Sequence, residues 1–263
     1  MKNKLYALLI LSLLFVKCSE SDEPSVDDVE ELADEETPLP LEDVIIGQQT
    51  WANRDLSDTV FRNGDVILKA TTALEWQSAG SAGIPAWCYQ DFNDANAGKG
   101  VYYNWHVVND DRGIAPVGWR VPSIEEWETL GDYIMEQHQG TPGFPYEFNP
   151  GAKALMSESG WPTIDLVFGD CLENIQTCEA GNGTDDYGFA AQPGIYTTFD
   201  GRVGYDRLLD CDGKEATYVR WWSTTLKENG EYAYYADITP ISVPSSGSRS
   251  ILLGSGIKVR CIR

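Results

Sequence analysis

Two short stretches of the sequence gather side chains whose oxygen atoms could bind a calcium ion. They hold Asp91, Asn93, Asp94 and Asn96 in the first stretch, and Asp185 and Asp186, after Gly181-Asn182-Gly183-Thr184, in the second. Calcium prefers carboxylate and amide oxygens, but the first stretch lacks the glycine and terminal glutamate spacing of an EF-hand. Asp and Asn also favour tight turns. Turn chemistry is the favoured interpretation of both stretches, structural calcium is the alternative, and no other cofactor is expected.

Residues for catalysis give a weaker signal. The chain has two histidines, His106 and His138, and His106 stands in the aromatic block that starts at Tyr103. A Ser-His-Asp triad needs a histidine beside its nucleophile, whereas a residue in such a block is expected to be structural. Paired carboxylates for glycoside hydrolysis are uninformative in a chain with 41 acidic residues. We expect no catalytic residues and no enzyme, with an enzyme acting on polysaccharide as the less favoured alternative.

The N-terminus carries the pattern of an export signal. Lys2 and Lys4 precede a continuous apolar stretch over residues 5–16, which is shorter than the roughly 20 residues that span a bilayer. Residues 1–17 are therefore interpreted as a signal peptide. Cys18 directly after it resembles the lipobox of bacterial lipoproteins, although Lys17 departs from the small residue usual there. We expect lipidation of Cys18; a plain secretory signal is the alternative.

Residues 19–43 differ sharply in composition from the rest of the chain. They contain twelve acidic residues, three prolines and no basic or aromatic residue, so they cannot bury a core and are expected to form an extended tether. The acidic run right after Cys18 resembles the surface-export signal of Bacteroidetes lipoproteins. This resemblance implies an outer-membrane lipoprotein exposed on the cell surface; a periplasmic spacer is the alternative.

Charge and composition bound the classes of partner. The 41 acidic and 19 basic residues give a net charge of −22, and residues 44–263 alone, with 29 acidic and 16 basic residues, still carry −13. Such a charge repels phosphate backbones, so a nucleic-acid partner is not expected. With 42% hydrophobic residues and nine Trp spread along the chain, residues 44–263 are expected to fold as one domain.

The patterning of that domain is mostly strand-like, with about two helices. Short apolar runs such as residues 218–222, 232–238 and 257–261 are separated by Gly, Asn, Asp and Pro, which is typical of strands and loops. One helix is predicted to start after Ser123, where Ser123 and Glu126 form a capping box. A second short helix is expected at residues 152–157. The pattern indicates an α+β fold with long irregular loops.

Several motifs occur in one order along the domain. They are Ile46-Gly47-Gln48-Gln49-Thr50-Trp51, Trp87-Cys88-Tyr89, Tyr103-Asn104-Trp105, Pro116-Val117-Gly118-Trp119-Arg120-Val121-Pro122-Ser123 with Glu126-Trp127, Tyr187-Gly188-Phe189, Trp222-Ser223-Thr224-Thr225 and Val259-Arg260-Cys261. Together they resemble the Fibrobacter succinogenes major paralogous domain. The resemblance implies a C-type-lectin-like fold with short antiparallel strands, and no known activity. The motif residues Trp119, Arg120, Pro122, Ser123, Glu126, Trp127, Trp222 and Ser223 are interpreted as scaffold, and at least one of Trp221 and Trp222 as buried.

The implied lectin-like fold raises two functional comparisons. The calcium motifs of C-type lectins are absent, since Glu-Pro-Asn and Trp-Asn-Asp do not occur and Gln192-Pro193 is followed by Gly194. Residues 120–127 are also similar to a segment of formylglycine-generating enzymes, which share the fold and need a late cysteine pair for copper. The late cysteines here, Cys211 and Cys261, stand fifty residues apart, so this similarity supports the fold and not the activity.

Five cysteines remain once Cys18 is assigned to lipid. In an oxidising compartment, two disulfides and one free thiol are the natural count. Members of the resembled family often carry a cysteine where this chain has Ala115. Zinc is not favoured, because no Cys-x-x-Cys pair exists. The expected bridges are Cys88 with Cys261 and one among Cys171, Cys178 and Cys211.

These features together predict a lipid-anchored cell-surface protein for binding or adhesion, whose ligand is a glycan or a surface protein. A structural component of the cell envelope is the alternative. Recognition is expected in the loops at Asp200–Lys214 and Pro240–Leu253, because a rigid scaffold tolerates variation in its loops. The alternative, that both segments are plain solvated connections, is slightly favoured over a role in recognition.

Overall fold

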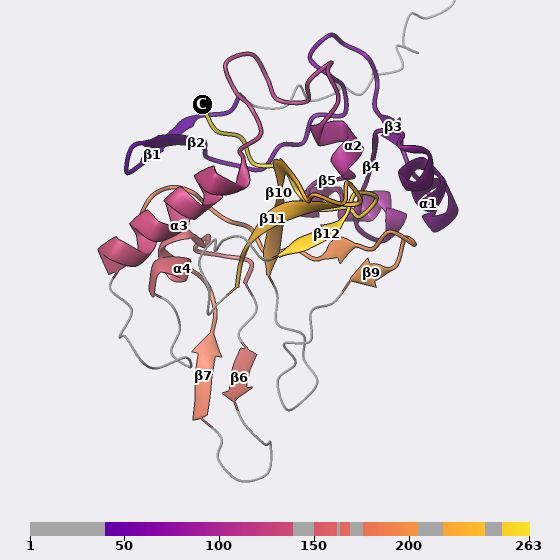
Figure 1. The fold of residues 1–263 in the computed structure, drawn as a ribbon. Coiled ribbons are helices and arrows are strands. Elements are labelled where there is room, and N and C mark those ends of the chain that lie inside the picture. The colour runs from indigo at the N-terminus through magenta and orange to yellow at the C-terminus, as the bar shows by residue number, and fades with distance from the viewer. Residues whose placement is uncertain (1–39, 139–149, 162–163, 169–175, 205–217, 240–248) are drawn as a thin grey trace, which may run out of the picture. The chain divides into compact units, whose positions relative to one another are not determined.

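The computed structural model describes residues 40–138, 150–161, 164–168, 176–204, 218–239 and 249–263 (Figure 1). The expected signal peptide, Cys18 and the tether up to residue 39 lie outside these residues. Within them, no helix is both long enough and apolar enough to span a bilayer. Helices and small sheets alternate along the chain, as expected for an α+β fold.

The first strands form two small sheets. β1 (Asp43–Ile46) and β2 (Gln49–Ala52) make an antiparallel hairpin, which turns at Gly47 with a positive φ of 60°. β3 (Leu68–Lys69) runs parallel to β4 (Ala86–Cys88), and β4 pairs antiparallel with β5 (Tyr102–Tyr103). Short 3-10 helices, η1 (Gln90–Phe92) and η2 (Asp94–Lys99), connect β4 to β5.

Four α-helices occur in the described residues, two more than the sequence indicated. α1 (Ala73–Ala82) is capped by Thr72, whose side chain accepts from the Glu75 amide, and ends at Gly83 in the left-handed region. α2 (Trp105–Val108) is a single turn. The predicted helices are α3 (Ile124–His138) and α4 (Pro150–Leu155), so α4 starts two residues earlier than expected.

The start of α3 realises half of the predicted capping box. The Ser123 amide donates to the Glu126 carboxylate at 2.9 Å, and the nearby Ser123 side chain lowers the pKa of Glu125. The expected apolar stripe of α3 is buried. Because both acidic side chains lie in the first turn, they also favour this helix end electrostatically.

The second half of the domain is built from antiparallel pairs. β6 (Ile164–Phe168) pairs with β7 (Gln176–Ala180), and β8 (Tyr196–Thr197) pairs with β9 (Val203–Gly204). β10 (Val219–Leu226), β11 (Tyr232–Ile238) and β12 (Ser250–Leu252) form a three-stranded sheet in that order. Figure 1 shows β10 and β11 between α3 and α2, and both helices contact β10.

The strand β10 separates two hydrophobic cores. Trp221 packs with Trp51, Trp127 and Phe189 in one core, and Trp222 packs with Trp105 and other side chains in the second. Successive side chains of a strand point to opposite faces, so both faces of β10 are covered. All nine Trp of the chain are described and buried. The expectation that at least one of Trp221 and Trp222 is buried is confirmed for both.

The last residues of the chain join these parts. Gly256 bonds with Thr197, Ile257 with Tyr103, Lys258 with Arg220 and Trp222, Val259 with Leu56, Cys261 with Ala52, and Ile262 with Arg120, all through the backbone. Residues 254–262 are buried throughout. This segment therefore brings distant parts of the sequence together around its own charged side chains.

Candidate functional site

A small polar pocket opens beside this C-terminal segment. Its volume is about 320 Å³, and it is lined by Asp55, Gly98, Lys99, Gly100, Gln192, Pro193 and Lys258. Asp55 follows β2, residues 98–100 end η2, and Gln192 follows the buried Ala191. The backbone bond from Leu56 to Val259, at 2.8 Å, holds the Asp55 loop against the C-terminal segment. Four separate parts of the chain thus converge on one cavity.

Asp55 is the centre of a buried ionic cluster. Its Oδ1 accepts from Trp221 Nε1 at 2.7 Å and from Arg260 Nε at 2.8 Å. Its Oδ2 lies 3.1 Å from Lys258 Nζ. Burial by itself raises the pKa of Asp55, but the charges of Arg260 and Lys258 and the hydrogen bonds outweigh it, so the pKa lies below its ordinary value of 3.8. Asp55 is therefore held as a carboxylate.

Arg260 belongs to the scaffold behind the pocket. Its side chain is fully buried, and its Nη1 donates to the carbonyls of Ala52 and Phe189. The guanidinium also stacks over the Phe189 ring, 4.3 Å from the ring centre. Every face of this group is occupied by protein, so Arg260 orients Asp55 and is closed to a ligand.

Lys258 is also buried, at 3% side-chain exposure, but it reaches the pocket. Glycines make room for it. A Cβ atom on Gly194 would lie 3.2 Å from Lys258 Cε, and a Cβ atom on Gly100, whose φ is 92°, would lie 3.7 Å from the same atom. Lys258 and Arg260 are two residues apart on one extended segment, so both point toward Asp55.

A second pocket, of about 360 Å³, lies at the start of α3 and includes Arg62, Arg120, Ser123 and Thr224. Its cations are already engaged. Arg62 donates from Nε and Nη2 to the Ala115 carbonyl at 2.9 and 2.7 Å, and Arg120 pairs with the Glu126 carboxylate. The pocket beside Lys258 is therefore the better candidate for ligand binding.

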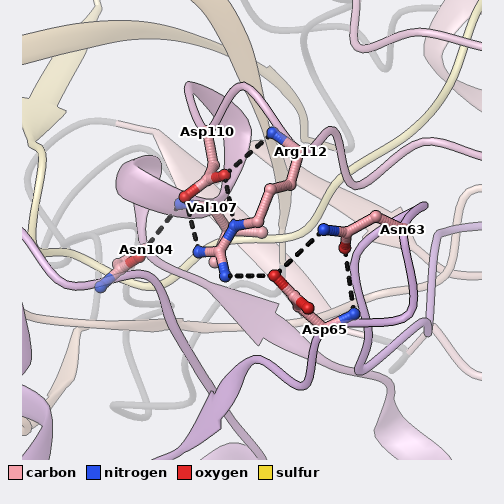
Figure 2. Close-up of polar contacts among 6 residues, drawn as sticks. All are labelled: Asn63, Asp65, Asn104, Val107, Asp110 and Arg112. Atoms are coloured by element: carbon pink, nitrogen blue, oxygen red, sulfur yellow. Dashed lines mark hydrogen bonds and ion pairs between the residues drawn. The ribbon is translucent and has the colours of Figure 1, made fainter.

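A surface network supports the loop next to this second pocket (Figure 2). Arg112 donates to Asp110 at 2.8 Å and to Asp65 at 3.2 Å, and Asn63 donates to Asp65 at 3.0 Å. The hydrogen bonds from Asn63 and Arg112 lower the pKa of Asp65, and that from Arg112 lowers the pKa of Asp110. Exposed pairs of this kind contribute little stability, and Arg112, the one cation of the network drawn in Figure 2, is already paired with both carboxylates.

The expected scaffold motif sits where packing is dense. Trp119 and Trp127 are buried, and Pro122 is buried beside them. Trp222 Nε1 donates to the Tyr103 carbonyl at 2.7 Å, and the Ser223 hydroxyl donates to the Tyr234 carbonyl at 2.8 Å. None of these side chains lines the pocket beside Lys258.

The disulfide expected between Cys88 and Cys261 is wrong. Both residues are free thiols and buried. The Cys88 sulfur lies 3.8 Å from the Thr197 hydroxyl, in the core around Trp76, whereas Cys261 packs in the core that contains Trp222. Burial raises the pKa of each thiol to about 12. The expected second bridge rests on residues 171, 178 and 211, whose side chains lie outside the described residues.

The first oxygen-rich stretch is engaged in turn and helix-end contacts. The Asn93 side chain accepts from the Ala95 amide at 3.0 Å, and Asp94 pairs with Lys69 at 2.7 Å. Asn96 donates to the Gln90 carbonyl at 2.9 Å. Over the described ranges, no group of three or more His, Cys, Asp or Glu side chains is placed to hold a metal ion.

The second oxygen-rich stretch behaves similarly. Asp185 adopts a positive φ of 46°, and its carboxylate accepts from the Ala190 amide at 2.7 Å. Burial raises the pKa of Asp185. Asp186 is exposed. The carboxylate of Asp185 therefore closes the loop that leads to Phe189.

The two histidines contact neither the pocket nor each other. His106 Nε2 lies 3.3 Å from the Gly80 carbonyl, and His138 Nε2 lies 3.1 Å from the Tyr187 hydroxyl. Burial lowers the pKa of His106. Both rings take part in local packing between a helix and its neighbour.

The expected recognition loops are only partly described. At the start of the first, Asp200 bonds to Arg202 at 2.7 Å, and residues 205–214 lie outside the described residues. In the second, residues 250–252 form β12 and not a loop. Arg249, just before β12, pairs with the buried Asp237. This end of the segment is therefore fixed by the sheet.

The sequence analysis missed Asp55 and Lys258. The signal was present as two basic residues inside the apolar run Ile257-Lys258-Val259-Arg260-Cys261. The sequence analysis interpreted this run only as a short strand-like segment and assigned no role to its two cations. The structure buries both faces, which forces the two cations onto a shared carboxylate.

Fold and site together define an α+β domain with a small polar pocket built on an aromatic scaffold. The family model of the Fibrobacter succinogenes major domain matches residues 44–263. The chain therefore belongs to this family. No curated protein matches the chain, and no solved structure does.

Proposed function

We propose that this chain is a lipid-anchored cell-surface binding protein, and that its domain binds a glycan in the pocket beside Lys258. The anchor at Cys18, the acidic tether and a C-type-lectin-like arrangement belong to the same proposal. Their support is the pattern of residues 1–43 and the family membership of residues 44–263.

The observation that carries the proposal is the set of charged and polar side chains that line this pocket. At about 320 Å³, its volume is near the lower end of small-molecule sites, which span roughly 300–1,000 Å³. Such a space suits one or two sugar rings. The lining combines a carboxylate, two amines and an amide, and these groups can both donate to and accept from sugar hydroxyls.

The same lining favours binding over catalysis. A general base works best with a pKa near the operating pH, whereas the ionic partners of Asp55 keep its pKa below 3.8. The stacking of sugars on exposed tryptophan, which a lectin-like protein could use, has no support, because all nine Trp are buried. The proposal therefore relies on polar contacts inside the pocket for specificity.

A test can block the pocket without disturbing the core. A Cβ atom on Gly98 would meet no atom within 4 Å, so a side chain fits there without a clash. Because Gly98 lines the pocket, Gly98→Trp introduces a large ring at its wall. Ala97→Trp is the matched control, because Ala97 is its exposed neighbour in η2 and does not line the pocket. The full chain and both variants are compared by calorimetric titration with neutral and acidic oligosaccharides, with calcium and with chelator.

We expect saturable binding to the unaltered chain and to Ala97→Trp, and its loss in Gly98→Trp. Binding that survives in Gly98→Trp would locate the glycan site elsewhere. If no oligosaccharide binds to the unaltered chain, the glycan proposal fails and the alternatives are a protein ligand or a structural role in the envelope.

A further inference from the structure

The pocket beside Lys258 has an excess of positive charge. Its lining holds two ammonium groups, Lys99 and Lys258, and one carboxylate, Asp55. The guanidinium of Arg260 contacts that same carboxylate from behind. Asp55 thus pairs with two cations, Lys258 and Arg260, which are almost fully and fully buried, while Lys99 adds a further positive charge to the lining.

The second acid near this cluster does not change the balance at the pocket. Asp185 interacts with Arg260 through space, but its carboxylate is bonded to the Ala190 amide and it is absent from the pocket lining. Asp185 therefore offsets part of the positive charge of Arg260 from outside the pocket. Lys258 still shares Asp55 with Arg260.

Lys258 has unused hydrogen-bonding capacity. An ammonium group has three N–H donors, and Asp55 is the one polar group that contacts it in the part of the chain that the structure describes. A buried charge needs a partner and hydrogen bonds to offset the loss of hydration. At 3% exposure, Lys258 obtains little of this from bulk water, so the pocket is the place where a further acceptor fits.

Lys99 stands at the rim of the same cavity. It is exposed, ends η2, and has no ion-pair partner among the described residues. The domain as a whole is acidic, with a net charge of −13 over residues 44–263. A positively charged cavity in a negatively charged domain attracts anionic ligands locally.

We infer that the pocket binds an anionic group, a carboxylate or a sulfate ester, carried on a sugar. The inference rests on the proposed function and names the class of glycan. The anion accepts hydrogen bonds from Lys258 inside the cavity and from Lys99 at its rim, while Asp55 Oδ2 accepts a hydrogen bond from a hydroxyl of the same sugar. An uncharged sugar of equal size leaves the spare donors of Lys258 unpaired.

The experiment uses matched acidic and neutral ligands on the full chain. Galacturonate oligomers are compared with their methyl esters, which have the same length and no charge, and sulfated dextran oligomers are compared with plain dextran oligomers. The two pairs distinguish a carboxylate from a sulfate. Binding is measured by calorimetry at constant ionic strength.

Two variants test the named cations. Lys258→Gln removes a charge-assisted hydrogen bond and is expected to weaken the binding of the acidic ligand by about ten- to a hundred-fold. Lys99→Glu reverses an exposed charge, which leaves the core untouched and keeps the test valid if Lys258→Gln unfolds. Lys227→Glu is the control for charge, because Lys227 lies on the β10–β11 hairpin and lines neither pocket.

We expect at least one acidic ligand to bind about ten-fold or more tightly than its neutral counterpart, and Lys99→Glu to abolish that difference while Lys227→Glu preserves it. Equal binding of acidic and neutral oligomers would overturn the anion inference and leave the glycan proposal standing. An acid preference that Lys99→Glu does not alter would overturn the assignment to this pocket. Absence of binding by every oligomer would reject both proposals.

Discussion

Removing the Asp55 carboxylate should destabilise the domain more than any other single change of charge described above. In Asp55→Asn the side chain keeps its size, but Lys258 and Arg260, at 3% and 0% exposure, lose the anion they share. Breaking a buried ion pair by removing one partner costs about 3–5 kcal/mol, because an uncompensated buried charge remains. For a domain of this size the melting temperature should fall by about 6–20 °C.

The matched control is Asp110→Asn. Asp110 also pairs with an arginine at 2.8 Å, but that arginine, Arg112, is 37% exposed, so the loss should be about 1 kcal/mol or less. Both variants are compared with the unaltered chain by urea denaturation and thermal melting at pH 7. Equal and small losses in the two variants would refute the view that Asp55 holds buried cations in place.

Asp55→Asn should also change how the stability of the domain depends on pH in acid. Because the pKa of Asp55 is lower in the folded chain than its ordinary value of 3.8, folding disfavours protonation of this group. Its contribution to stability is complete above that value and is lost as the pH falls through the lower folded pKa. The stability of Asp55→Asn should therefore fall less steeply below pH 3.8 than that of the unaltered chain.

Three further outcomes follow from single contacts. Cys88 and Cys261, with thiol pKa values raised to about 12 by burial, should resist alkylation at pH 8 in the folded chain and react after unfolding; peptide mapping that finds a bridge between them would contradict the structure. Thr72→Ala removes the side-chain acceptor for the Glu75 amide at the start of α1 and should lower the unfolding free energy by about 1 kcal/mol, a loss that Thr72→Asn should largely avoid. Because burial lowers the pKa of His106, the unfolded chain binds a proton at this residue more readily than the folded chain, so the unfolding free energy should fall as the pH drops below 6.5. This fall should be smaller in His106→Gln. The same pH dependence of urea denaturation in the variant and the unaltered chain between pH 7 and 5 would exclude this role of His106.

Local sequence signals predicted the elements that depend on local contacts. The spacing of apolar residues after Ser123 identified α3, since one helix face and one cap decide that helix. α1 was missed, although Thr72 caps it and Gly83 ends it. Its ten residues bury only Trp76 and Ala79, so they show no clear apolar stripe for a periodicity argument to detect.

The features that the sequence did not predict depend on contacts between residues far apart in the chain. The predicted disulfide between Cys88 and Cys261 was wrong because the two thiols lie in different hydrophobic cores. The spacing of cysteines along the sequence does not show which core each one joins. The pocket was missed for a related reason. Asp55 is separated from Arg260 by 205 residues, and only the folded chain brings the two together.

The two oxygens of Asp55 link the stability of the domain to its proposed binding site. Oδ1 faces the scaffold, where it accepts from Trp221 and Arg260, whereas Oδ2 faces Lys258 in the pocket. Trp221 in turn stacks on Trp127, with ring centres 5.3 Å apart, at the start of the predicted helix. The Glu126-Trp127 motif therefore reaches the pocket through two contacts, from Trp127 to Trp221 and from Trp221 to Asp55. This chain of contacts holds the Asp55 carboxylate in position, and the carboxylate in turn holds the buried Lys258 ammonium at the pocket.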